Sequence, residues 1–251
     1  MSEALEPIGG LEAVHVTVGV EPRLAVVVLH GYAMRPEDLV PFARSMGVAA
    51  EFYFPEAPLD ADPAGKAWWP IDQERRARAL AVGPRDLSQE HPAGAAAARR
   101  LLAGLVEAVR SRHPGRALAI IGFSQGGMLA CDALLRGEVR ADALALLSSS
   151  RIAANEWEPL AGSPAGAGAG TLAGVQVLVS HGAQDQDLAF AAGEALRDFC
   201  ERAGAIVTWR PLAGGHEIPL LVWRGVRRLL GGLSEFREAT GGRNRRAPRS
   251  S

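Results

Sequence analysis

The sequence is poor in cysteine and lysine and has almost no net charge. Of its 251 residues, two are cysteines and Lys66 is the one lysine, and the formal net charge at pH 7 is -1. Cys131 and Cys200 lack the close spacing of metal-binding pairs, so we expect both to be reduced thiols in the core. The balanced charge argues against a general affinity for nucleic acid or for an anionic membrane.

Long apolar runs and a leader-like N-terminus are missing as well. No stretch approaches the roughly 18 consecutive apolar residues that are needed to cross a bilayer. The first six residues, Met-Ser-Glu-Ala-Leu-Glu, lack the basic and apolar regions of a secretory signal. We therefore expect a cytoplasmic protein without stable membrane insertion, while the sequence leaves the oligomeric state open.

Motifs for a metal or a cofactor are also missing. No group of His, Asp or Cys residues has the spacing of metal ligands. The segment Gly-Ala-Gly-Ala-Gly at 166–170 neither follows a predicted strand nor opens a helix, so it fails the conditions for a dinucleotide phosphate cradle. The sequence therefore predicts an activity that needs no metal and no cofactor.

Apolar runs alternate with helical patterns along the chain, which predicts an α/β fold with a mostly parallel sheet and helices on both faces. A chain of this length can form one large core, and we expect a single domain over residues 1–236. The predicted strands are 14–18 (an edge strand), 24–29, 51–54, 117–121, 144–147, 175–179 and 206–209. The predicted helices are 37–45, 93–112, 127–135, 188–202 and 218–230, with a further short helix within 72–81.

Three stretches interrupt this alternation. Residues 55–92 are too long for a simple strand-to-helix connection, and long connections in compact domains tend to be functional. Residues 162–170 are rich in Gly, Ala and Pro, which indicates a mobile surface loop. Residues 237–251 are rich in Arg and predict a disordered tail.

The most informative motif is Gly122-Phe123-Ser124-Gln125-Gly126. It lies between an apolar run and a helical pattern, which is the context in which G-x-S-x-G forms a nucleophile elbow. The two glycines leave room for a sharp turn that exposes the serine hydroxyl at its tip. We therefore predict that Ser124 is a catalytic nucleophile; the alternative is a glycine-rich turn whose serine only caps the next helix.

A serine hydroxyl needs a base and an acid that orients the base. In hydrolases with such an elbow, the acid and then the histidine follow the serine along the chain. His216 follows the last predicted strand and is the expected general base. Asp185 follows the strand before it and is the expected acid. Asp187 is its rival, with an N-cap of the next helix as its alternative role.

The other histidines after strands fit less well. His30 precedes the serine, so we expect it to support its own loop. His181 would need an acid between itself and the serine, and Asp132 lies too far into a helix for that role. Glu217, next to the expected base, is read as an acid in the first turn of the last helix.

The negative charge that develops on the substrate oxygen needs donors. The backbone N–H after the nucleophile, that of Gln125, is one expected donor. The loop after strand 24–29 supplies the second, which we assign to the N–H of Tyr32. Trp68, Trp69 and Met34 are candidates for an apolar acyl-binding surface, or alternatively belong to the core.

Together these motifs resemble the phospholipase/carboxylesterase family of α/β-hydrolases, which includes acyl-protein thioesterases and small bacterial carboxylesterases. The similarity spans roughly residues 23–231. It rests on Leu29-His-Gly31, Gly122-Phe-Ser-Gln-Gly-Gly127, His181-Gly-x-x-Asp185, Gly215-His216, and Pro55-Glu-Ala-Pro58 followed by Trp68-Trp-Pro-Ile-Asp72. The sequence departs from the family after the acid, where Gln-Asp-Leu-Ala-Phe replaces the usual Val-Pro, and at Trp69, where Phe is commoner.

The resemblance implies an α/β-hydrolase without a large cap domain. It implies a serine hydrolase that cleaves small-molecule carboxylic esters of short to medium acyl chains through an acyl-enzyme. An acyl-protein thioesterase or lysophospholipase needs the same triad and is the first alternative. A catalytically silent binding module is the second, and it predicts that a triad residue is missing.

Overall fold

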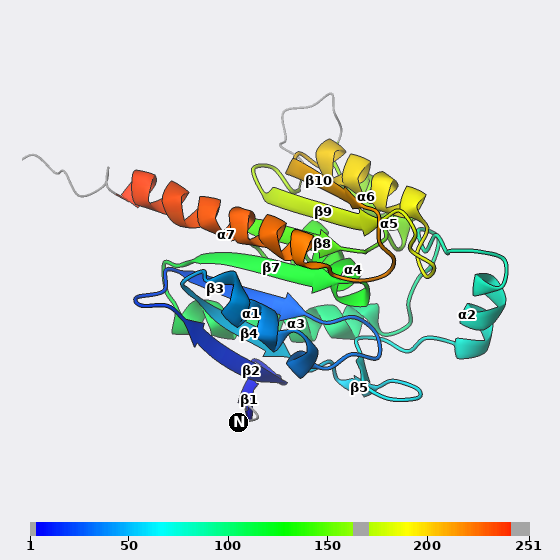
Figure 1. Ribbon diagram of the computed structural model, residues 1–251, viewed down its shortest axis with the longest axis horizontal. Coiled ribbons are helices and arrows are strands. Elements are labelled where there is room, and N and C mark those ends of the chain that lie inside the picture. The colour runs from blue at the N-terminus through cyan, green and yellow to red at the C-terminus, as the bar shows by residue number, and fades with distance from the viewer. Residues whose placement is uncertain (1–3, 163–170, 242–251) are drawn as a thin grey trace, which may run out of the picture.

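The computed structural model describes residues 4–162 and 171–241. Eight strands form one twisted sheet in the order β1-β2-β4-β3-β7-β8-β9-β10 (Figure 1). The strands β4, β3, β7, β8, β9 and β10 pair in parallel, whereas β1 and β2 join antiparallel at one edge. The bounds are Leu5–Ile8 (β1), Leu11–Val18 (β2), Leu24–Leu29 (β3), Ala50–Pro55 (β4), Ala117–Phe123 (β7), Ala143–Leu147 (β8), Gln176–Gly182 (β9) and Ile206–Leu212 (β10).

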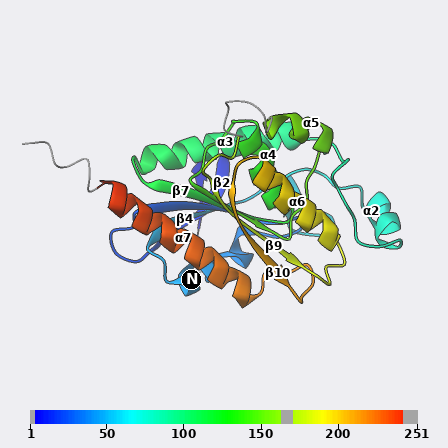
Figure 2. The same ribbon diagram turned by 90° about the horizontal axis from the view of Figure 1, so that it is seen from above.

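Helices cover both faces of this sheet (Figure 2). One face carries α3 (Ala95–Arg112), α4 (Gln125–Leu135), α5 (Ala154–Leu160) and α6 (Phe190–Arg202), and the other carries α1 (Val40–Met46) and α7 (Leu220–Gly241). Strands buried on both faces read as continuous apolar runs, as β3 does in Leu-Ala-Val-Val-Val-Leu. The two apolar cores therefore lie on either side of the sheet, and the carboxyl ends of the parallel strands are left free to carry a site.

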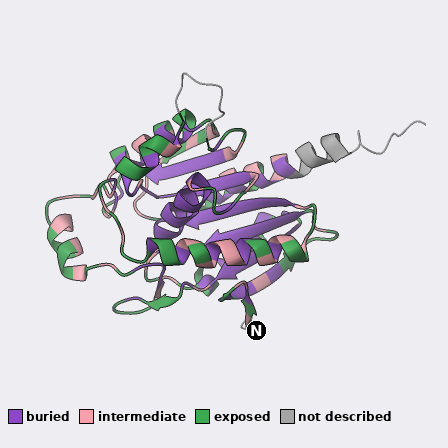
Figure 3. Ribbon diagram, turned by 180° about the vertical axis from the view of Figure 1, so that it is seen from behind, coloured by how far each residue is buried: buried purple, intermediate pink, exposed green. Residues whose placement is uncertain are grey.

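One helix belongs to neither layer. The segment α2 (Gln73–Leu80) stands off from the carboxyl-end edge of the sheet, and none of its residues is buried (Figures 1 and 3). Asp72 caps its N-terminus by accepting a hydrogen bond from the Arg75 N–H. Polar contacts connect α2 to the rest of the protein, through Gln73 to the Tyr32 hydroxyl and through Arg75 to Glu90.

The predicted α/β architecture is confirmed, with corrections in detail. Strand 14–18 belongs to β2, which is not the edge strand, because the unpredicted β1 pairs along its outer side. The predicted helix 37–45 is a 3-10 turn, η1 (Pro36–Asp38), followed by α1, in whose first turn Pro41 is placed because its missing N–H costs nothing there. Unpredicted elements are α5 and the short hairpin of β5 (Leu59–Asp60) and β6 (Lys66–Ala67).

Two predicted helix boundaries also move. The helix expected from residue 188 begins at Phe190, because Leu188 still forms an extended bridge with Arg85. The last helix, predicted over 218–230, begins at Leu220 and continues to Gly241. The rest of the predicted tail, 242–251, and nearly all of the predicted loop, 163–170, lie outside the described residues. Within the described part of the chain, no helix combines the length and the apolar character that a membrane span requires.

Candidate active site

Ser124 lies at the turn between β7 and α4, with φ 51° and ψ -117°. A non-glycine residue in this region is strained by about 1–3 kcal/mol, and such strain concentrates at functional sites. The flanking glycines are required by close backbone contacts. A Cβ on Gly122 would lie 2.5 Å from the Gly126 oxygen, and one on Gly126 would lie 2.6 Å from the Leu29 oxygen. The motif therefore folds as the sharp elbow that the sequence predicts.

The three predicted catalytic side chains form one hydrogen-bonded chain. His216 Nε2 lies 3.0 Å from Ser124 Oγ, and His216 Nδ1 lies 2.7 Å from Asp185 Oδ2. The residues come from the ends of β7 and β9 and from the loop after β10, so the parallel sheet brings them together although up to 92 positions separate them. Phe123 packs against the imidazole, with the ring centroids 5.0 Å apart.

The carboxylate of Asp185 is held from two sides. Its Oδ1 accepts hydrogen bonds from the backbone N–H groups of Asp187 and Leu188, both at 2.8 Å, which leaves Oδ2 for His216. Burial raises the pKa of Asp185, but the hydrogen bond and charge of His216 and the two N–H groups outweigh it, so the net pKa lies below the ordinary value. Asp185 is therefore an ionised, fixed acceptor for the imidazole.

Asp187 does not contact His216 by a hydrogen bond, and it does not cap α6, whose N-cap residue is Ala189 without a side-chain cap. Its carboxylate instead pairs with Arg76 of α2 at 3.0 Å and with Arg85. Burial raises the pKa of Asp187. The hydrogen bond from Arg76 and the charges of both arginines lower it by more, so the net pKa lies below the ordinary value. The capping role considered for Asp187 is thus wrong.

The two other histidines that follow strands, His30 and His181, are structural. His30 Nε2 accepts the Ala57 N–H at 3.1 Å, so its Nδ1 carries the proton and donates to the Gly31 oxygen at 2.7 Å. His181 Nε2 donates to the Leu188 oxygen at 3.1 Å. Burial lowers the pKa of both imidazoles. His30 thereby supports the loop after β3, as predicted, and His181 supports the loop that carries the acid.

Gln125 has a side-chain role that the sequence did not indicate. Its amide accepts the Trp68 N–H and donates to the Trp69 oxygen, both at 2.9 Å, and so fixes the loop that precedes α2. Its backbone N–H and that of Tyr32 are the two expected oxyanion donors. Within the described part of the chain, neither donates to a protein acceptor, which leaves both N–H groups available to a ligand.

A cavity of about 160 Å³ opens onto Ser124 and His216. Met34 and Trp69 line it, whereas Trp68 does not. Trp68 is 1% exposed and donates its indole N–H to the His30 oxygen at 2.9 Å, so it belongs to the core that supports the loop after β3. Assigning Trp68 to the acyl surface is therefore wrong. The sequence could not distinguish the two adjacent tryptophans, because an irregular loop has no periodicity that tells which side chain faces inward.

A second cavity, of about 320 Å³, adjoins the first. The two cavities share Trp69, Ile71, Arg76, Arg85, Leu87 and Met128. The second is also lined by α2 and by the segment 90–93. The second cavity therefore lies next to the cavity at Ser124, between the sheet edge and α2.

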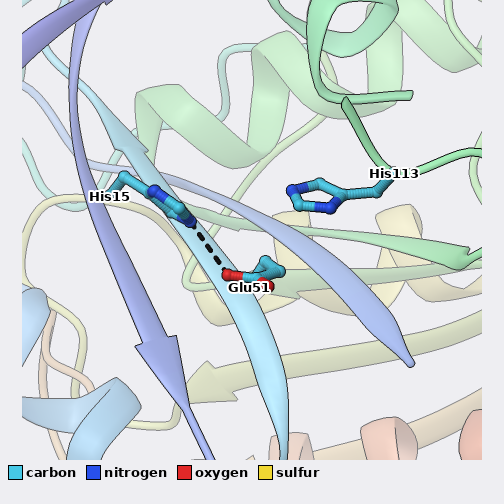
Figure 4. A group of neighbouring side chains, drawn as sticks. All are labelled: His15, Glu51 and His113. Atoms are coloured by element: carbon cyan, nitrogen blue, oxygen red, sulfur yellow. Dashed lines mark hydrogen bonds and ion pairs between the residues drawn. The ribbon is translucent and has the colours of Figure 1, made fainter. Parts of the chain in front are cut away.

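A separate group of titratable side chains lies at the opposite edge of the sheet, where β4 begins. His15, Glu51 and His113 place one potential metal-ligand atom each within 4.8 Å of one another (Figure 4). Glu51 already accepts hydrogen bonds from Thr17 at 2.7 Å and from Arg116 at 3.0 Å. Because the guanidinium of Arg116 supplies the positive charge that a metal would bring, we assign this group a structural role in joining β2, β4 and the end of α3. Sequence spacing did not reveal it, since the three residues meet only in the fold.

No protein-family model matches the chain, and no curated protein matches it in sequence. Solved structures do match. A carboxylesterase from Mesorhizobium loti superposes with a TM-score of 0.70 at 22% identity, over 91% of this chain and 98% of its own. Zea mays acyl-protein thioesterase 2 superposes with a TM-score of 0.69 at 19% identity, over 88% of this chain and 98% of its own. The carboxylesterase of Bacillus cereus superposes with a TM-score of 0.67 at 16% identity, over 89% of this chain and 94% of its own. With its mostly parallel sheet, helices on both faces and, over the described residues, no large cap domain, the chain has the α/β-hydrolase fold.

Proposed function

We propose that this protein is a serine hydrolase that cleaves carboxylic esters of short to medium acyl chains. The observation that carries the proposal is the continuous hydrogen-bonded chain from Asp185 through His216 to Ser124, with the serine on a strained elbow. The similarity in fold to carboxylesterases is consistent with it. A silent binding module would be expected to lack one of these groups, and all three are present.

In the proposed reaction, Ser124 Oγ attacks the substrate carbonyl carbon while His216 Nε2 takes the hydroxyl proton. The N–H groups of Tyr32 and Gln125 donate to the oxyanion that forms. The imidazolium then gives its proton to the leaving alcohol, and the carbon–oxygen bond breaks to leave an acyl-serine. A water molecule, deprotonated by His216, attacks this ester; the imidazolium then returns that proton to Ser124 Oγ as the acyl–oxygen bond breaks, which releases the acid and the free serine. Asp185 holds Nδ1–H throughout and remains ionised.

The size of the cavity favours short acyl groups. An engineered cavity of about 150 Å³ holds a single benzene molecule, so the 160 Å³ at Ser124 accommodates a group of similar bulk. A long acyl chain would have to continue into the second cavity. A thioester substrate remains the alternative, since one structural neighbour is named as an acyl-protein thioesterase. Rates on a palmitoyl thioester peptide and on short nitrophenyl esters separate the two.

Labelling with a fluorophosphonate tests the proposal directly. We expect one adduct per chain by intact mass, and none in Ser124→Ala. Ser111→Ala, at an exposed position of α3, is the matched control and should label like the wild type. A wild-type protein that is folded by circular dichroism yet takes up no label, and hydrolyses no ester, would exclude the serine hydrolase and favour the binding module.

A further inference from the structure

Two arginines line the cavity that contains Ser124 and share a single carboxylate. Arg76 comes from α2 and Arg85 from the segment after it, and both lie on the shared wall between the two cavities. Asp187 bridges them, with Oδ2 toward Arg76 and Oδ1 toward Arg85. The side chain of Arg76 is 31% exposed and that of Arg85 is 13% exposed, so both guanidiniums are partly shielded from solvent. A charge acts more strongly in such surroundings than in water.

The remaining acids nearby do not neutralise the second guanidinium. Asp185 turns its fully buried carboxylate toward His216 and two backbone N–H groups. Glu90 is paired with Arg75, and Asp72 accepts the N–H that caps α2. The wall of the first cavity therefore carries one positive charge in excess, at Arg76 and Arg85.

The two guanidiniums also have hydrogen-bond donors to spare. Each guanidinium has five N–H donors in a fork that fits a carboxylate or a phosphate. Among the described residues, Arg76 donates one hydrogen bond, and Arg85 donates two, all of them to Asp187. Donors thus remain on both side chains for an anionic ligand in the cavity.

We propose that Arg76 and Arg85 bind a negatively charged group of the substrate, so that the protein prefers short esters or thioesters that bear a carboxylate or a phosphate. This inference rests on the proposed function, because it names the substrate class of the same serine site. The small volume beside Ser124 requires the charged group to lie only a few atoms from the reacting carbonyl. A purely apolar acyl chain would instead place methylene groups against two guanidiniums and leave their donors without ligand acceptors.

Matched substrates test the preference. Mono-(4-nitrophenyl) glutarate and 4-nitrophenyl pentanoate differ only in a terminal carboxylate in place of a methyl group. We expect the wild type to have the higher kcat/KM on the glutarate ester. In Arg76→Gln the ratio of the two kcat/KM values should fall about 10- to 100-fold, the usual loss for one charged hydrogen bond. Arg78→Gln, on the same helix but 72% exposed, should leave the ratio unchanged.

Asp187→Asn provides the opposite change, because it removes the carboxylate that competes for the two arginines. We expect the ratio to rise above that of the wild type. A second pair, S-butyryl thioglycolate and the neutral S-butyryl thioethanol, places the charge on the leaving group, and a phosphate in place of the carboxylate identifies the preferred anion. A preference for the anionic member of any of these pairs, lost in Arg76→Gln, supports the inference.

Equal rates on charged and neutral members throughout, or a ratio that Arg76→Gln and Asp187→Asn leave unchanged, would overturn it. That failure is distinct from failure of the proposed function. In the first case the neutral esters are still hydrolysed and Ser124 is still labelled by the fluorophosphonate. In the second, no ester is hydrolysed and no label is found.

Discussion

The substitution Asp185→Asn separates the orienting role proposed for this residue from its role in stability. The Oδ1 position faces two backbone N–H donors, so only an acceptor satisfies it. The asparagine must therefore keep its carbonyl oxygen there and turn its NH₂ group toward His216 Nδ1. Two donors cannot share a hydrogen bond, so His216 moves its proton to Nε2, the atom that accepts the proton of Ser124 in the proposed reaction.

The expected loss is large for that reason. A comparable change of tautomer in a serine protease triad lowers kcat by about 10⁴-fold, which corresponds to about 5.4 kcal/mol of activation free energy. Stability should change much less, because the two backbone hydrogen bonds to Oδ1 persist. The alternative amide orientation would leave both N–H groups unpaired, at about 1–3 kcal/mol each, and is therefore disfavoured.

The assay is kcat on a short nitrophenyl ester near pH 8, together with the free energy of unfolding in urea. Asp198→Asn, at an exposed position of α6, serves as the control and should change neither quantity. A variant Asp185→Asn that keeps more than about a hundredth of the wild-type kcat would refute the reasoning, since the wrong tautomer cannot act as the base.

Two further predictions concern stability. Gly126→Ala should lower the free energy of unfolding by at least about 1–3 kcal/mol, because the new Cβ lies 2.6 Å from backbone oxygens of Leu29 and His30 that cannot swing away. Gly231→Ala, where nothing lies within 4 Å, should instead raise it by about 0.5–1 kcal/mol; denaturant titrations that give both variants the wild-type value would contradict this account. The pKa of Asp187 in the folded protein lies below its value of about 3.9 in the unfolded chain. Ionised Asp187 therefore stabilises the fold at pH values above about 3.9, and this stabilisation is lost as the pH falls through the folded pKa. Asp187→Asn should therefore lose less stability than the wild type between about pH 6 and pH 3, and identical pH profiles would show that its ion pairs do not contribute.

The sequence could predict that Ser124, Asp185 and His216 would lie together, because their order along the chain and their places after strands both follow from the fold. Ser124, Asp185 and His216 each follow a predicted strand, and parallel strands end at one edge of a sheet. The core strands could be predicted as well, since burial on both faces leaves uninterrupted apolar runs in the sequence.

The charged wall of the cavity could not be predicted from the sequence. Asp187 lies 111 positions from Arg76, and nothing local indicates where an exposed helix such as α2 will dock. Arginine is abundant in this chain, so composition does not mark the two that face the cavity. The same limit applies to Trp68 and Trp69, which are neighbours in sequence but are divided between core and cavity by one irregular loop.

The isolation of α2 bears on how this protein changes over evolutionary time. An eight-residue helix with no buried side chain contributes little to the free energy of folding, so most substitutions in it escape the destabilisation that restricts core positions. Yet this helix supplies Arg76 to the wall of the cavity beside Ser124. Residues that set the charge of the cavity can thus be replaced while the sheet and the elbow stay intact, so the charge of this wall can change by selection without loss of the scaffold.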